Sequence, residues 1–159
     1  IRVLFELGYE PWLVLGKRVA EVKRIALDAG QHLNRFESQY LLMGGNEVSF
    51  ATGLKKGKGA TTASKREAAW MRSWEAVSGE NGNLGLAIVM DPAAGVEVRE
   101  DETNYLMVAK AAPGQPAVYY AGSAWDRGGD IADVAAWEAY LDRWAERLRT
   151  PVTVQLSAQ

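Results

Sequence analysis

Residues 70–90, WMRSWEAVSGENGNLGLAIVM, decide the fold class of this chain. The side chains at Trp70, Arg72 and Trp74 alternate with those between them, which indicates a β-strand, although composition alone would also allow a helix. Residues 78–83, SGENGN, contain the Asn-Gly pair typical of tight hairpin turns. An apolar run follows at once, so the stretch predicts an antiparallel hairpin and a mainly β fold.

The same period-two alternation extends along the chain in both directions. It recurs in residues 3–9, 19–27, 32–42, 48–52, 105–110, 117–121 and 152–156. Gly and Pro separate these runs, as expected of turns, and Pro11 is expected to end the first one. Residues 53–66, GLKKGKGATTASKR, are rich in Gly, Lys and Thr and predict a mobile loop.

The period changes once, near the C-terminus. Apolar residues there are spaced by three and four, as in one stripe of an α-helix: Val134, Trp137, Leu141, Trp144 and Leu148. We expect a helix over residues 131–149, with Asp130 or Asp133 capping its start and Pro151 ending it. About eight strands and one helix predict a mostly β fold, a β-sandwich or part of a supersandwich with one C-terminal amphipathic helix.

Composition limits the classes of function. With 159 residues and a net charge of −2, the chain fits a single domain without the basic field that nucleic acid requires. No apolar run approaches the length of a membrane span. The sequence has no Cys and one His, which excludes thiolate chemistry and multi-histidine metal sites, and we expect neither metal nor cofactor. Because strand-like sequence begins at Arg2, we expect the C-terminal part of a longer chain, partnered by an N-terminal half, a companion chain or a second copy.

The single histidine is the first candidate for chemistry. His32 is expected to share a strand face with Asn34, and its near-neutral pKa suits a general acid or base. It could equally be a histidine that hydrogen-bonds at the start of a strand. Arg35 and Glu37 are expected to project together from the opposite face, either as a binding pair or as an exposed ion pair.

Aromatic and basic residues give two further candidate surfaces. Trp70 and Trp74, about 13 Å apart on a strand, could stack on sugar rings with Arg72 between them for a uronate carboxylate. Packing of the same indoles in the core is the alternative. Lys110, Tyr119 and Trp125 lie in or after the predicted strands 105–110 and 117–121, next to a Gly-rich loop, and predict a second binding surface.

Several motifs together resemble one bacterial family. They are LDAG with HLNRFES in residues 27–38, WE with GENG in residues 74–82, YYAGSAW with GD in residues 119–130, and Trp137. The family is a domain of unknown function, number 4861, found fused to or encoded beside unsaturated-glucuronyl hydrolases. The resemblance runs over nearly the whole chain and covers the C-terminal half of the family's domain.

This resemblance implies a galactose-mutarotase-like supersandwich with its ligand on the concave sheet, in a periplasmic or secreted protein of polysaccharide degradation. It implies a lyase or dehydratase that acts on uronate-containing oligosaccharides by elimination, which needs a base, an acid and a cation for the carboxylate. For such chemistry we assign catalysis to His32, Arg35 and Tyr119, and substrate binding to Asn34, Glu37, Trp70, Arg72, Trp74, Lys110 and Trp125. The alternatives are a non-catalytic carbohydrate-binding module, an aldose epimerase and a glycoside hydrolase.

Overall fold

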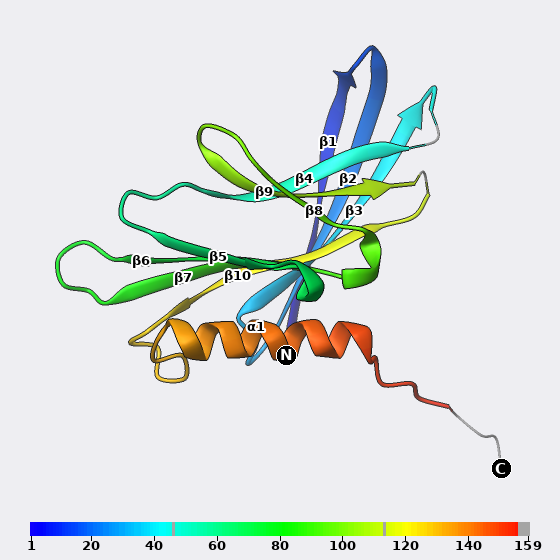
Figure 1. Cartoon of the computed structure of the whole chain (residues 1–159). Coiled ribbons are helices and arrows are strands. Elements are labelled where there is room, and N and C mark those ends of the chain that lie inside the picture. Colours follow the sequence, from blue (N-terminus) through cyan, green and yellow to red (C-terminus); the bar gives the residue numbers. More distant parts are fainter. Residues whose placement is uncertain (46, 113, 156–159) are drawn as a thin grey trace.

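The computed structural model describes residues 1–45, 47–112 and 114–155, which form two antiparallel sheets and one α-helix. The sheets stack, and the helix lies across the far face of the larger one (Figure 1). The strands are β1 (Arg2–Val14), β2 (Lys17–Asp28), β3 (Leu33–Met43), β4 (Val48–Lys55), β5 (Thr61–Lys65), β6 (Trp70–Ala76), β7 (Asn83–Met90), β8 (Glu97–Glu100), β9 (Asn104–Ala111) and β10 (Ala117–Trp125). Two short 3-10 helices, η1 (Arg66–Ala68) and η2 (Pro92–Ala94), precede the helix α1 (Val134–Arg149).

The large sheet has the strand order β1-β2-β3-β10-β7-β6-β5, and the small sheet has the order β4-β9-β8. The late strand β10 inserts between β3 and β7, so two segments far apart in sequence become neighbours. The hairpin predicted from residues 70–90 forms as β6 and β7, with Trp74 opposite Gly85. The mostly β fold class with a single C-terminal helix is thereby confirmed.

Both faces of β6 and β7 are covered, which explains their nearly continuous apolar sequence. Trp70 and Val89 face α1, where they pack against Trp137 and Leu141. Met71 and its neighbours face the small sheet and form a second cluster. Four residues of the predicted stripe, Trp137, Leu141, Trp144 and Leu148, therefore contact the sheet, and Tyr140 and Ala145 join them.

The helix begins at Val134, three residues later than predicted, because Asp133 and not Asp130 is its N-cap. The Asp133 carboxylate accepts a hydrogen bond from the backbone N–H of Ala136 at 2.8 Å, as a helix cap does. Residues 131–133 precede the helix, and Ile131 is buried against the sheet. The predicted end at Arg149 is confirmed.

Three boundary predictions were wrong. β1 continues through Pro11 with a register shift between Tyr9 and Trp12, since a proline is tolerated on an edge strand. The predicted loop 53–66 is largely strand, because β4 pairs with β9 and β5 pairs with β6, which leaves residues 56–60 as the connection. Residues 152–155 are not a strand, and Leu156 lies outside the described residues.

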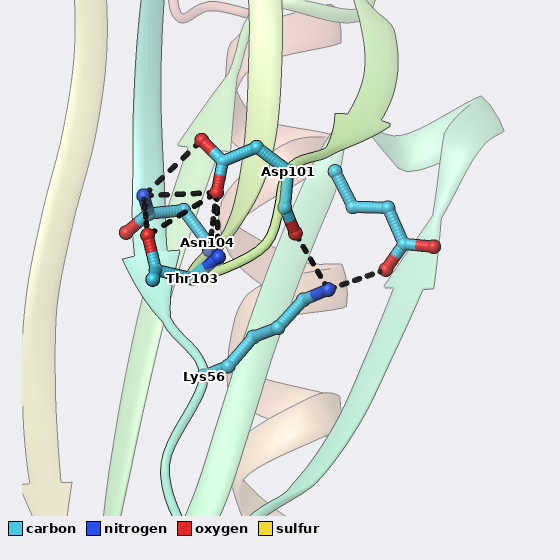
Figure 2. A network of polar contacts seen from close by, with 5 residues as sticks. Lys56, Asp101, Thr103 and Asn104 are labelled. Carbon is cyan, nitrogen blue, oxygen red and sulfur yellow. Dashed lines mark hydrogen bonds and ion pairs between the residues drawn. The ribbon is translucent and has the colours of Figure 1, made fainter.

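A polar network fixes the turn between β8 and β9 (Figure 2). Asp101 Oδ1 accepts hydrogen bonds from the backbone N–H groups of Thr103 and Asn104 at 2.8 and 2.7 Å, and these bonds hold the pKa of Asp101 below its ordinary value. Lys56, just after β4, donates to the Asp101 carbonyl at 2.8 Å and pairs with Glu100 at 3.0 Å. The network therefore ties together three segments at one end of the small sheet.

Candidate functional site

Charged side chains cover the face of β1, β2 and β3 that lies on the same side as α1. Arg35 is opposite Tyr120 in the register of β3 and β10, and Tyr120 packs against the helix cluster, which places Arg35 on that side. The register places Arg24 between Glu6 and Glu37. These three strands rise away from the helix at one end of the sheet (Figure 1), and the side chains of Arg24 and Glu6 on this face are about half exposed.

Two cavities lie over this face. One, of about 250 Å³, is lined by Arg2, Leu4, Arg24, Ala26, Asp28, Arg35 and Glu37. The other, of about 170 Å³, is lined by Glu6, Val22, Arg24, Glu37, Gln39 and Pro116. Because Arg24 and Glu37 line both, the cavities adjoin, and we refer to them together as the β1–β3 groove.

Ion pairs run across the groove from strand to strand. Arg24 donates to Glu6 Oε1 at 2.8 and 2.6 Å, a contact that raises the pKa of the guanidinium, and it lies 3.9 Å from Glu37. Arg2 forms a two-pronged pair with Asp28 at 2.7 and 2.9 Å, which lowers the pKa of Asp28. The groove therefore alternates in charge and holds its guanidinium groups in carboxylate-binding geometry.

Arg35 uses fewer of its nitrogens in hydrogen bonds than Arg2 and Arg24, which each use two. It pairs with Glu37 through Nη1, while 42% of its side chain is exposed. A guanidinium carries several N–H donors, and among the described residues Arg35 uses only this one nitrogen in hydrogen bonds. Its remaining donors can bind a ligand carboxylate from solvent.

His32 is on the α1 side of the sheet, not on the Asn34 side as predicted, because the turn before Leu33 breaks the alternation. Its ring packs edge-on against Trp137 and Tyr140, with centroids 5.9 and 5.2 Å apart. Its Nε2 atom lies 2.7 Å from Asp130, and this contact lowers the pKa of the Asp130 carboxyl. These contacts favour a structural role, in which His32 holds the turn before β3 against the helix.

Tyr119 and Asn34 lie on the opposite face, toward the small sheet. The Tyr119 ring stacks on Phe36 at 4.8 Å, and burial raises the pKa of its hydroxyl. Asn34 donates to the carbonyl of Ala121 at 3.3 Å. The predicted catalytic trio of His32, Arg35 and Tyr119 therefore does not meet in one site, because the sheet separates Tyr119 from Arg35.

The Trp70–Arg72–Trp74 row lies beneath α1. Trp70 donates to Asp142 at 2.8 Å, and Arg72 donates to Glu138 at 2.9 Å, both across to the helix. Trp70 and Arg72 are buried, while Trp74 is half-buried against the same cluster. Core packing accounts for this row, and the predicted sugar platform is covered by the helix.

Lys110 and Trp125 lie away from the groove. Lys110, on β9 of the small sheet, pairs with Glu47 at 2.8 Å. Trp125 ends β10 and donates to the carbonyl of Asn81 at 2.7 Å, at the turn between β6 and β7. Of the predicted site residues, only Arg35 and Glu37 line the groove.

Sequence reasoning missed Arg2, Glu6, Arg24 and Asp28 as parts of the groove. A signal was present, since β1 and β2 each carry two opposite charges four residues apart on one face, Arg2 with Glu6 and Arg24 with Asp28. This signal could not be interpreted from the sequence, because strand pairing brings these charges into one row and the sequence of one strand does not show which strand it pairs with.

A second polar cluster lies on the other face of the same strands. Lys23 Nζ is 3.4 Å from the buried Glu21 Oε1, without hydrogen-bond alignment, and 5.2 Å from the centre of the Tyr9 ring. Burial and the nearby Glu21 raise the pKa of Tyr40 to about 12. Because Val19 and Tyr40 belong to a buried core cluster, we assign these polar groups to the interior between the sheets.

A further cavity of about 550 Å³ lies between η1 and the second half of α1. Four of its charged groups contact one another, since Lys65 bonds Asp142 on the helix at 3.0 Å and Arg149 pairs with Glu146 within the helix. Within the described part of the chain, no three acidic or histidine side chains are grouped to hold a metal ion. No helix among the described residues is long and apolar enough to cross a membrane.

A family model described as "Domain of unknown function (DUF4861)" matches residues 1–154. The chain belongs to the DUF4861 family. Uncharacterized protein P7 of Formosa agariphila is 32% identical to this DUF4861 chain over 162 residues, which cover 98% of the chain and 40% of P7. The chain therefore spans less than half the length of this relative. No solved structure matches it.

Proposed function

We propose that the β1–β3 groove binds uronate-containing oligosaccharides, and that the family protein acts on them by elimination, as a lyase or dehydratase. The observation that carries this proposal is the cavity of about 250 Å³, which is lined by three guanidinium groups, those of Arg2, Arg24 and Arg35, and by two carboxylates, those of Asp28 and Glu37. Guanidinium groups bind planar carboxylates in a two-pronged way, and a uronate offers one such group on each acidic sugar ring.

The pairing of Arg35 with Glu37 suggests how binding would prepare the chemical step. A uronate carboxylate that binds the free donors of Arg35 competes with Glu37 for the guanidinium. The guanidinium withdraws charge from the sugar carboxylate and makes the C5 proton more acidic. Glu37, released from its partner, is then a base close to the bound sugar.

The elimination itself is balanced without a redox partner. Glu37 takes the C5 proton, the C5–H electrons form the C4=C5 double bond, and the C4–O bond breaks with its electrons on the leaving oxygen. That oxygen takes up a proton as it departs. The product is a 4,5-unsaturated uronate, whose conjugated double bond absorbs ultraviolet light.

A second candidate is carbohydrate binding without turnover. It is favoured by the charge balance of the groove, where Arg2, Arg24 and Arg35 each contact an acidic side chain of the protein itself. A groove of paired charges can exchange these contacts for those of an anionic ligand and perform no chemistry.

Calorimetric titration with saturated oligouronates, combined with ultraviolet absorbance, tests both candidates. We expect Arg35→Gln to weaken binding by about tenfold or more, because a charge-assisted, two-pronged contact is lost. Arg99→Gln is the matched control, since Arg99 forms the same two-residue-spaced pair with Glu97 on β8 of the other sheet, at 2.5 Å. Glu37→Gln should retain binding and abolish any rise in absorbance.

The outcomes separate the candidates. Binding with a rise in absorbance supports elimination. Binding without a rise, in a protein of P7-like length as well as in this chain, supports the binding module. If neither Arg35→Gln nor Arg99→Gln changed the affinity, the groove would have no part in elimination or in binding.

A further inference from the structure

The first strand carries a self-complementary sequence on an open edge. β1 is the terminal strand of the large sheet, with β2 as its one neighbour among the described strands. Residues 1–7, IRVLFEL, place a basic residue two positions before Leu4 and an acidic residue two positions after it. All other positions in the segment are apolar. We call residues 1–7 the β1 edge.

We propose that the β1 edge pairs in antiparallel fashion with the β1 edge of a second copy of this chain, with Leu4 opposite the partner's Leu4. This register sets Arg2 opposite the partner's Glu6 and Val3 opposite the partner's Phe5. Opposite charges and apolar residues that face each other across strands stabilise a sheet. Every pair in the segment is therefore favourable.

The register is selective. A shift by one residue sets Arg2 opposite the partner's Leu7 and Val3 opposite the partner's Glu6, so that each charge loses its partner. Register is well specified where the pattern on the strand distinguishes one alignment from the next. An unrelated strand would have no reason to match this order, which is why a second copy is the favoured occupant.

Existing ion pairs extend the complementarity across both subunits. Arg2 bonds Asp28 at 2.7 Å, and Glu6 bonds Arg24 at 2.6 Å, on the neighbouring strand β2. In the paired form, one row of side chains with alternating charge crosses both subunits. It consists of Asp28, Arg2, the partner's Glu6 and the partner's Arg24. The partner strand thus continues a charge pattern that the monomer already holds in place.

Pairing also covers an aggregation-prone edge. The exposed fractions of Val3, Leu4 and Phe5 are 58%, 55% and 49%, on a strand whose outer backbone groups are free to bind another strand. Leu4 lines the β1–β3 groove, so the two grooves meet at the symmetry axis between the subunits. The partner's Leu4 and Glu6 then border the groove of the first subunit.

Sedimentation of the whole chain tests the proposal, with substitutions at the axis. We expect a dimer of the 17.4 kDa chain. Leu4→Lys and Leu4→Glu should each weaken association on the order of 100-fold, because like charges then face each other at the axis. Mixing the two variants should restore a dimer that contains one chain of each, since Lys then faces Glu.

Leu41→Lys is the control, because Leu41 is 62% exposed on β3, away from the edge. It should leave the dimer intact, and all variants should keep the circular dichroism of the wild type. A monomer at all concentrations would overturn the proposal, as would a dimer that survives Leu4→Lys. So would a β1 edge that becomes protected from hydrogen exchange only when a different polypeptide segment is added.

Discussion

The Nε2 atom of His32 lies 2.7 Å from Asp130, and this contact joins the turn before β3 to the segment before α1. The Tyr140 hydroxyl accepts a hydrogen bond from the His32 backbone N–H at 3.1 Å and strengthens the same junction. The only histidine of the chain therefore connects two segments that lie almost a hundred residues apart in sequence. This setting favours the second of the two alternatives that the sequence left open, a histidine that hydrogen-bonds at the start of a strand.

We expect His32→Ala to lower stability by roughly 1–3 kcal/mol, because it removes edge-on packing against two aromatic rings and the contact with Asp130. Oligouronate affinity should remain close to wild type. Chemical denaturation and calorimetric titration measure the two effects. A variant with wild-type stability and no turnover would restore His32 to a catalytic role.

The two helix tryptophans should differ in their contribution to stability. Trp137 is fully buried, whereas Trp144 is half-buried at the edge of the cluster. Trp137→Ala should cost about 3–5 kcal/mol of unfolding free energy, as large-to-small changes in a core do, and Trp144→Ala should cost clearly less. Urea denaturation measures both. Equal losses would show that the helix packs through a different stripe.

Tyr40 should ionise well above the ordinary range of tyrosine as pH rises. Burial, helped by Glu21, raises its pKa to about 12, so the neutral hydroxyl is favoured in the folded state. The resulting stability is fully present below the ordinary tyrosine pKa of about 10 and is lost as pH rises from there through about 12.

Spectrophotometric titration of phenolate absorbance tests this expectation. Tyr40→Phe should remove a late component that titrates near pH 12. Tyr105→Phe is the control, because Tyr105 lies outside the polar cluster, beside Lys56. Loss of the late component in the Tyr105 variant, with its retention in the Tyr40 variant, would contradict the assignment.

Local patterns predicted most of the elements. The β6–β7 hairpin and the α1 stripe follow from periodicity and turn chemistry within about twenty residues, and both formed as expected. The predictions for Pro11 and for residues 53–66 were wrong because the conformation there depends on which strands lie alongside. Pro11 is tolerated since β1 is an edge strand, and the Lys-rich stretch is ordered because β5 pairs with β6.

The sequence predicted only part of the candidate site. Arg35 and Glu37 were predicted to project together, and their ion pair shows that they do. Their neighbours Arg24 and Glu6 come from other strands, and strand register alone brings them into the groove.

By itself, the sequence determined which side chains share a strand face or a helix stripe, because backbone geometry within one element sets that period. It could not determine what covers each face. Trp70 and Arg35 both lie in strand sequences with period-two alternation. The helix α1 covers Trp70, whereas Arg35 lines an open groove. That difference arises from non-local packing, in which the chain buries its helix stripe against β6 and β7, and only the tertiary structure decides it.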